Sequence, residues 1–175
     1  ALNLGIQINK IKKALKKFLG IQRRFTFLGK INKSFIYDDY AHHPTEIEAS
    51  YNIAKHLAKK NIIVIFQPHR FTRTKYLYSK FINVLKKIDI LYICDVYPAG
   101  EKSIKNINAK KFVRDIKKLN SQVYYLNKKE NINKTLSTYY KEENLIIFMG
   151  AGSISKYAYR LINENNVRKN IKNIR

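Results

Sequence analysis

The 175-residue chain has a single cysteine, few acidic residues, and little glycine or proline. Cys94 is alone in an apolar segment, so an internal disulfide is excluded and an inert, buried thiol in a reducing, cytoplasmic compartment is expected. No apolar run approaches the roughly 20 residues that span a bilayer, so we expect no membrane partner. The hydrophobic content of 45% excludes general disorder. The sequence therefore predicts a globular protein with one main core.

The shortage of acids leaves 35 Lys and Arg against 12 Asp and Glu, a formal net charge of +23. Such a charge favours nucleic-acid binding, because basic side chains displace counterions from phosphate backbones. The lysines, however, are spread along the whole chain together with abundant Asn and Ile, and they form no Arg-rich patch interleaved with aromatic residues. We therefore predict no specific nucleic-acid partner, only weak association that salt abolishes.

Hydrophobic periodicity predicts an α/β fold. Four nearly continuous apolar runs indicate strands covered on both faces: Ile62–Phe66, Ile90–Cys94, Val123–Leu126 and Leu145–Met149. Segments with apolar residues three or four positions apart, as in a helix, separate these runs. Strands and helices in alternation predict a doubly wound, mostly parallel sheet.

The ends of the chain differ from this regular part. Residues 25–28 and 34–38 predict a hairpin joined by residues 29–33, and residues 1–20 predict a separate helix with Gly20 as its cap. The chain begins without an initiator methionine, so we expect a longer protein upstream. The predicted organisation is the N-terminal helix, a main domain over residues 21–165, and a basic tail over residues 166–175 that frays.

Polar chemistry is concentrated in the loops that follow the predicted strands. All three prolines and three of the four histidines lie there. The loops cover residues 39–46, 67–74, 95–101 and 150–153. Because parallel sheets bind ligands beyond the carboxyl ends of their strands, these loops predict one composite polar site.

The segment over residues 38–46 combines two interpretations. Proline, threonine and glutamate at residues 44–46 suit the first turn of a helix. They do not account for the four polar residues before them, Asp38, Asp39, His42 and His43. We interpret those four as part of a ligand site. A zinc site made by Asp39, His42, His43 and His69 is an alternative, but no cysteine contributes and the spacing fits no standard pattern, so no metal site is predicted.

Arg70 and Arg73 are three residues apart just after a strand. Two neighbouring guanidiniums can hold one carboxylate or phosphate in fixed geometry, which favours a substrate anion over the alternative, a structural salt bridge. The Gly-Ala-Gly run at residues 150–152 allows a tight turn that exposes backbone amides at the start of the last helix. That feature suits anions in general and is weakly specific.

Five ordered segments resemble the C-terminal domain of the Mur ligase family. They are Arg-Arg-Phe at 23–25, Asp-Asp-Tyr-Ala-His-His-Pro-Thr-Glu at 38–46, Phe-Gln-Pro-His-Arg-Phe-Thr-Arg-Thr at 66–74, Asp-Val-Tyr-Pro-Ala-Gly-Glu at 95–101 and Gly-Ala-Gly at 150–152. Within the family the resemblance is greatest to the members that add L-alanine to UDP-N-acetylmuramate. Muropeptide-recycling members share the Asp-Asp-aromatic-Ala-His-His-Pro run but lack the His-Arg-aromatic-Thr-Arg-Thr segment, and they are the alternative.

The resemblance implies an ADP-forming ligase of peptidoglycan precursor synthesis that uses ATP and Mg²⁺. In this chemistry the muramyl carboxylate is phosphorylated, and the amino group of L-alanine then attacks the acyl phosphate. The resemblance implies that Arg24 approaches the ATP phosphates and that Asp39 binds the nucleotide ribose.

The same resemblance implies that Arg70 and Arg73 hold the alanine carboxylate, with His69 beside them. Tyr40, His42 and His43 are expected to line the same cleft. A general base for the alanine amine is expected among the histidines, because an imidazole titrates near neutral pH.

The family's phosphate-binding loop, Gly-x-x-x-x-Gly-Lys-Ser or Thr, does not occur in the chain. The resemblance therefore implies that the ATPase domain and the uridine-nucleotide domain of the same enzyme are missing from this chain, and these two domains are its expected partners. Residues 1–19 resemble the last helix of the ATPase domain, and the magnesium ligands are expected mainly on that domain. The chain alone is not expected to catalyse ligation, because it lacks groups that stabilise the transition state. A noncatalytic or decayed basic binding module is the competing interpretation.

Overall fold

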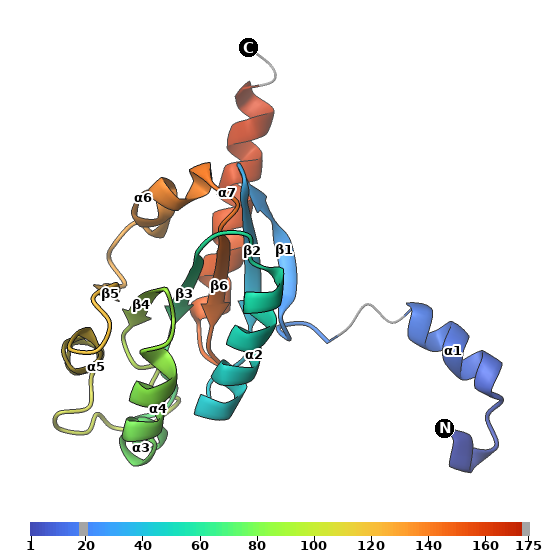
Figure 1. Cartoon of the computed structure of the whole chain (residues 1–175), viewed down its shortest axis with the longest axis horizontal. Helices are drawn as coiled ribbons and strands as arrows, with labels where there is room; N and C mark the ends of the chain where they lie inside the picture. Colours follow the sequence, from blue (N-terminus) through green and yellow to red (C-terminus); the bar gives the residue numbers. More distant parts are fainter. Residues whose placement is uncertain (18–20, 173–175) are drawn as a thin grey trace.

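The computed structural model describes residues 1–17 and 21–172. Among them, six strands form one twisted sheet in the order β1-β2-β6-β3-β4-β5 (Figure 1). The strands are β1 (Thr26–Ile31), β2 (Ser34–Asp39), β3 (Ile62–Phe66), β4 (Ile90–Cys94), β5 (Val123–Leu126) and β6 (Leu145–Met149). Only β1 is antiparallel to its neighbour, and the other pairs are parallel. The predicted doubly wound, mostly parallel sheet is confirmed.

Helices cover both faces of this sheet. One face packs against the helices α2 (Pro44–Leu57), α4 (Tyr78–Leu85) and α5 (Ala109–Lys117), with the short α3 (Phe71–Tyr76) before α4. The other face packs against α6 (Ile132–Leu136), the 3-10 helix η2 (Ser137–Lys141) and α7 (Ile154–Lys172). The helical segments that were predicted between the apolar strands are confirmed.

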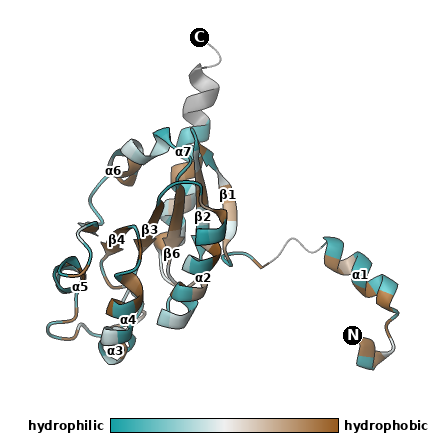
Figure 2. Ribbon diagram, viewed as in Figure 1, coloured by the Kyte–Doolittle hydropathy of each residue, from teal (hydrophilic) through white to brown (hydrophobic). Residues whose placement is uncertain are grey.

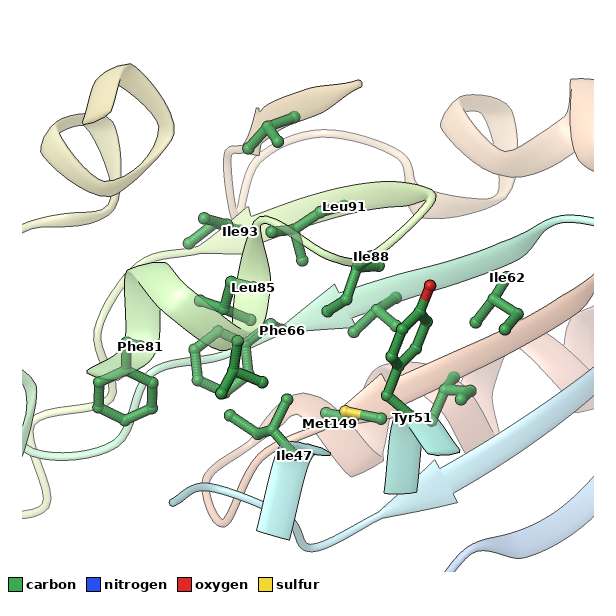
Figure 3. Close-up of a cluster of buried hydrophobic side chains, with 14 of the residues drawn as sticks. Ile47, Tyr51, Ile62, Phe66, Phe81, Leu85, Ile88, Leu91, Ile93 and Met149 are labelled. Carbon is green, nitrogen blue, oxygen red and sulfur yellow. The ribbon is translucent and has the colours of Figure 1, made fainter. Parts of the chain in front are cut away.

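The alternation of side chains along β3 explains why both faces are apolar. Ile62, Val64 and Phe66 belong to the core beneath α2 and α4, which Figure 3 shows in close-up. Ile63 and Ile65 belong to the core beneath α7. Successive strand residues point to opposite faces, so a strand covered on both sides needs apolar residues at every position. Figure 2 shows the resulting hydrophobic strands between more polar helices.

The hairpin is confirmed, but its turn is shorter than predicted. β1 continues to Ile31, so only residues 32 and 33 connect the strands. Ile31 is 1% exposed, and its burial keeps the segment in the sheet although Gly29 and Lys30 favour a turn. Gly29, at φ 148°, lies at a register shift in the strand and faces Ile162 of α7. It therefore marks a bulge and not the turn.

The two ends of the chain extend away from the sheet (Figure 1). The short 3-10 helix η1 (Leu2–Leu4) and the helix α1 (Ile8–Lys17) contain no buried residue. The predicted cap Gly20 lies outside the described residues. At the other end, α7 continues to Lys172, into the basic tail that was predicted after Asn165. None of the helices in the described part of the chain is long and apolar enough to cross a membrane.

Candidate functional site

The loops after β2, β3, β4 and β6 meet at one edge of the sheet, as predicted from the parallel order. Backbone hydrogen bonds connect each loop to the next one across the sheet, in the order β2, β6, β3 and β4. Gly150 N donates to Asp39 O at 3.0 Å, Gln67 N to Met149 O at 2.9 Å, and Tyr97 N to Pro68 O at 2.8 Å. The four loops therefore form a single framework, and side chains that are distant in sequence come close together there.

A row of aromatic rings crosses this edge. The Tyr40 and His42 rings meet edge to face at 5.2 Å, and His42 meets His69 at 5.7 Å. His69 in turn stacks on Tyr97 at 5.4 Å with an interplanar angle of 13°. The row connects the ends of β2, β3 and β4, and it brings together three of the residues predicted to line the cleft. Tyr97 belongs to a predicted loop, but no role was predicted for it.

Asp38 and Asp39 point to opposite faces of the sheet because they are adjacent in a strand. Asp38 is 0% exposed and accepts a hydrogen bond from Ser155 Oγ of α7 at 2.6 Å. Burial raises its pKa, although Ser155 and Arg23 act in the opposite direction.

Asp39 is 4% exposed and faces α2. Its carboxylate accepts hydrogen bonds from Ser50 Oγ at 2.7 Å, from Ala41 N at 2.7 Å and from Phe25 N at 3.2 Å. Three donors of the chain itself therefore occupy the carboxylate that was predicted to bind ribose. Because a carboxylate offers about four acceptor positions, little of this capacity is left for a ligand.

His43 is the N-cap of α2. Its Nδ1 accepts a hydrogen bond from Thr45 N, and the Glu46 carboxylate accepts one from His43 N at 3.2 Å, which completes a capping box. The helix-start interpretation was applied to residues 44–46 alone, and it has to include His43. The sequence did not indicate this because histidine is not among the residues usually found at this position.

His42 is held differently. Its Nδ1 lies 3.0 Å from Tyr40 O and 3.3 Å from the Glu46 carboxylate. The backbone N–H of His42 donates to the same carboxylate at 3.0 Å. A carbonyl oxygen can only accept, so the contact with Tyr40 places the proton on Nδ1 and leaves Nε2 as the basic nitrogen. Burial acts to raise the pKa of Glu46, but the amide of His42 and neighbouring cations lower it overall.

His69 and Arg73 form the next part of the site. An Arg73 terminal nitrogen lies 3.4 Å from His69 Nδ1, and because a guanidinium only donates, Nδ1 accepts in this contact. Burial lowers the pKa of His69, and the neighbouring His42, Arg73 and Arg70 lower it further. The neutral imidazole is therefore favoured. Arg73 lies in α3, which begins at Phe71, so the loop after β3 is shorter than the predicted residues 67–74.

Arg70 forms a salt bridge that the sequence left as the alternative interpretation. Its Nε donates to Glu101 Oε1 at 2.6 Å, and Thr72 binds both oxygens of the same carboxylate. These bonds, with Thr72 contributing most, lower the pKa of Glu101 to about 2. Within the described residues, the terminal nitrogens of Arg70 make no hydrogen bond, and its side chain is 48% exposed. Arg70 can therefore keep this salt bridge and still hold an anion.

The backbone of Arg70 has φ 70°, which is unusual for a residue other than glycine. Its N–H donates to Tyr97 O at 2.8 Å, so the loop after β4 holds this conformation in place. Backbone strain of this kind concentrates at functional sites. Glu101 and the strained backbone are features that sequence reasoning missed. The only available signal was an acid in the loop that follows the next strand of the sheet.

Arg23 and Arg24 differ in exposure, because Arg23 is half-buried and Arg24 is exposed. The Arg23 guanidinium lies 4.7 Å from the centre of the Tyr40 ring and donates to Gly150 O, and its Nε is 3.6 Å from Asp38 Oδ2. Arg24 is exposed, and its guanidinium lies 5.7 Å from the same ring. No role was predicted for Arg23, because an Arg-Arg pair does not indicate which of its members is partly buried.

The glycine turn allows close approach between the last two loops. A Cβ at Gly150 would lie 2.8 Å from Gln67 O, and one at Gly152 would lie 2.5 Å from Gln67 Oε1 and from Tyr97 Cγ. Gln67 Oε1 also accepts a hydrogen bond from Ile154 N at 3.0 Å, and thus caps the start of α7. Packing explains the glycines at this position, and two of the amides that were predicted to be exposed, Gly150 N and Ile154 N, donate within the chain.

A cavity of about 220 Å³ borders Tyr97 and is lined in part by Gln67, Cys94 and Ser153. Burial raises the pKa of the Cys94 thiol to about 12, which agrees with the inert thiol that the sequence predicted. In the part of the chain that the structure describes, no three His, Cys, Asp or Glu side chains are grouped so that they could hold a metal ion.

Comparison with known proteins identifies the family. The sequence profile described as "Mur ligase, glutamate ligase domain" matches residues 23–152. The chain belongs to the Mur ligase family. The matched range contains all five of the segments that resembled this family.

Curated relatives in the Mur ligase family include the UDP-N-acetylmuramate–L-alanine ligase of Aquifex aeolicus, which is 39% identical over 170 residues. That alignment covers 97% of this chain and 36% of the relative. The ligase of the same name from Wigglesworthia glossinidia brevipalpis is 39% identical over 172 residues, 92% of this chain and 36% of the relative. The chain thus spans about a third of the length of the curated relatives it matches.

Solved structures of Mur ligases have the same fold. The UDP-N-acetylmuramate–alanine ligase MurC of Thermotoga maritima superposes with a TM-score of 0.74 at 27% identity, over 95% of this chain and 35% of that one. A murein peptide ligase of Psychrobacter arcticus superposes with a TM-score of 0.66 at 23% identity, over 94% of this chain and 34% of that one, and shows the fold alone.

Proposed function

We propose that the chain is the C-terminal domain of a UDP-N-acetylmuramate–L-alanine ligase and contributes to the binding of ATP and L-alanine. The observation that supports this proposal most strongly is the row of rings formed by Tyr40, His42 and His69. Arg24 lies beside Tyr40 at one end of this row, and Arg73 contacts His69 at the other. Through this reaction the chain would act in peptidoglycan precursor synthesis, and so in cell-wall growth, cell shape and cell division.

The alanine carboxylate is assigned to Arg70 and Arg73. Arg70 approaches it with terminal nitrogens that Glu101 leaves free, while Arg73 also contacts His69. Two guanidiniums bind a carboxylate with defined geometry, and the carboxylate would compensate their mutual repulsion. This arrangement holds the alanine so that its amino group faces the imidazoles.

The general base for the alanine amine is assigned to His42, with His69 beside it. Burial and neighbouring cations lower the pKa of His69 and favour its neutral form, but Arg73 donates to its Nδ1, so its unprotonated nitrogen is already occupied. His42 offers Nε2 as a basic nitrogen. His43 would contribute indirectly by capping α2 and so fixing the segment that carries Tyr40 and His42. A base that is unprotonated at neutral pH is ready to accept the proton that the attacking amine loses.

The ATP phosphates are assigned to Arg24, because it is the exposed member of the Arg-Arg pair at the same edge. Asp39 could reach the ribose only through an acceptor position that its three internal donors leave free. The described residues at this edge do not fit a magnesium site, since Asp38 and Asp39 are buried against the chain's own donors. We assign the magnesium ligands to the ATPase domain of the ligase.

A chimeric ligase tests the proposed function. The chain would be joined to the preceding two thirds of the Aquifex aeolicus relative, in place of the matching segment. We expect phosphate release that requires ATP, UDP-N-acetylmuramate and L-alanine together, and no activity from the chain alone. A folded chimera that binds ATP but releases phosphate with no amino acid would contradict the proposal. Activity with a short peptide in place of L-alanine would instead indicate a recycling ligase.

A further inference from the structure

Arg24 lies at the centre of a tight turn, and both of its neighbours have left-handed backbone conformations. Arg23 has φ 61° and Phe25 has φ 46°, and neither is a glycine. Residues other than glycine adopt such angles only where surrounding contacts enforce them. The contacts that hold the two neighbours therefore determine where the Arg24 side chain points.

Arg23 is fixed by both its side chain and its backbone. Its carbonyl accepts a hydrogen bond from Tyr40 N at 2.7 Å, and its guanidinium donates to Gly150 O. Its Nε lies 3.6 Å from the carboxylate of Asp38, which Ser155 of α7 holds from the other side. This side of the turn is thus attached to the face of the sheet that α7 covers.

Phe25 is fixed from the opposite face. Its N–H donates to Asp39 Oδ2 at 3.2 Å, and its ring packs 4.7 Å from the ring of Tyr37. Asp39 is braced in turn by Ser50 Oγ of α2 at 2.7 Å. Because Asp38 and Asp39 are consecutive in β2, one strand end holds the turn at both of its flanks. Pairing of Thr26 with Asp38 in the sheet places the turn directly beside this strand end.

We propose that Arg23, Asp38 and Asp39 are positioning residues that hold the exposed guanidinium of Arg24 beside the Tyr40 ring, where it meets the ATP phosphates. The inference rests on the proposed function, because it takes the Arg24 ligand to be ATP. It assigns the tandem aspartates a task that helix capping does not explain. They act on the nucleotide through Arg24, without contact between Asp38 and the nucleotide.

A double-mutant cycle in the chimeric ligase tests this arrangement. The variants are Arg24→Gln, Asp38→Asn and the two combined, with the KM for ATP and the KM for L-alanine measured for each. We expect Asp38→Asn to raise the KM for ATP about fivefold, which is the size of the coupling usually found between residues in one polar network. The KM for L-alanine should change by less than about twofold, since Arg70 and Arg73 keep their own contacts. In the Arg24→Gln background, Asp38→Asn should have no further effect.

Two comparisons separate positioning from a general loss of structure. Asp89→Asn is the matched control, since Asp89 also accepts hydrogen bonds, from Tyr51 Oη and Ile62 N, outside the polar edge. It should leave the KM for ATP unchanged. Arg23→Gln removes the partly exposed partner of Asp38 in the same contact. It should raise the KM for ATP about as much as Asp38→Asn, and it replaces Asp38→Asn in the test if the Asp38→Asn variant folds poorly. Arg23→Lys, which keeps the charge, should recover part of the affinity.

The possible outcomes distinguish the inference from the proposed function. The positioning role is wrong if Asp38→Asn and Arg23→Gln raise the KM for ATP by the same factor whether or not Arg24 is present. It is also wrong if these two variants leave both the KM for ATP and the KM for L-alanine unchanged. If Arg24→Gln itself leaves the KM for ATP unchanged, the assignment of Arg24 to the phosphates is wrong. In that case phosphate release by the unsubstituted chimera still decides the proposed function independently.

Discussion

The loop after β2 and the loop after β3 reach the same edge of the sheet, but their polar side chains have different partners. Asp39, His43 and Glu46 bind amides and hydroxyls of the chain itself. Arg70 and Arg73, which follow β3, each keep part of the guanidinium free of hydrogen bonds among the described residues. Around the end of β2, Asp39, His43 and Glu46 build the framework, whereas Arg70 and Arg73 after β3 present groups to a ligand.

Side-chain length explains this difference. The carboxylate of an aspartate lies close to its own backbone, so at a strand end it reaches neighbouring amides and helix hydroxyls first. An arginine carries its charge several bonds away and can bind one partner through Nε while its terminal nitrogens face solvent. Polar residues in a strand-end loop therefore indicate a site, but their length and burial determine which of them remain available to a ligand.

The largest effect is expected for Asp39→Ala, which removes the acceptor of three hydrogen bonds, two of them buried. We predict a loss of about 3 kcal/mol in the free energy of unfolding, because the donors would be left without partners. Urea unfolding of the chain measures this. Asp95→Ala is the matched control, since exposed Asp95 accepts a side-chain hydrogen bond from Tyr125 Oη alone among the described residues and should cost less than about 1 kcal/mol. Equal losses for the two variants would contradict the framework role.

Arg70→Gly should have the opposite pattern, with a large effect on binding and a small one on stability. We expect the KM of the chimera for L-alanine to rise at least about tenfold, as for the loss of a charge-assisted contact. The free energy of unfolding should change by less than about 1 kcal/mol, because glycine tolerates φ 70° and the salt bridge is partly exposed. Arg160→Ala, on the exposed side of α7, is the control. A marked loss of stability with unchanged KM would show that Arg70 belongs to the framework.

Glu101→Gln should produce a smaller change in the same direction. The substitution keeps the shape of the side chain but weakens its hold on Arg70 and Thr72, so we expect the KM for L-alanine to rise about threefold. With its pKa at about 2, Glu101 is ionised at every pH used for assays. The effect should therefore be independent of pH between about pH 5 and about pH 9. A KM that is unchanged would show that Arg70 does not need this salt bridge for binding.

The sequence predicted the fold well because burial on both faces produces a simple pattern. The strands Ile62–Phe66, Ile90–Cys94, Val123–Leu126 and Leu145–Met149 have the predicted bounds. The hairpin turn was placed too early, because Gly29 favours a turn when its neighbour Ile31 is ignored. The burial of Ile31 keeps this segment in the strand, although its local sequence favours a turn.

The site was predicted in composition but not in its internal contacts. Parallel strands bring the loops together, so the closeness of Tyr40, His42 and His69 followed from topology. The capping by His43 and the partial burial of Arg23 depend on backbone angles and on contacts with α2 and with the strand end that α7 covers, which no spacing rule supplies. Glu101 is recognised as the partner of Arg70 only from the structure, in which the loops after β3 and β4 lie next to each other.

The smallest effect is expected from the titration of His69. Burial first, and then His42, Arg73 and Arg70, lower its pKa from the usual 6.5, while Glu101 acts weakly in the opposite direction. The unfolded chain therefore binds more protons than the folded one between the lowered value and 6.5, so the free energy of unfolding rises with pH through that window and falls on acidification. His69→Gln should remove this part of the pH dependence, measured by urea unfolding between about pH 5 and about pH 8. His56→Gln, which removes an exposed imidazole from α2, is the control and should keep the pH dependence of the unsubstituted chain. If His69→Gln kept the same slope, the ring would not be held in its neutral form by the framework around it.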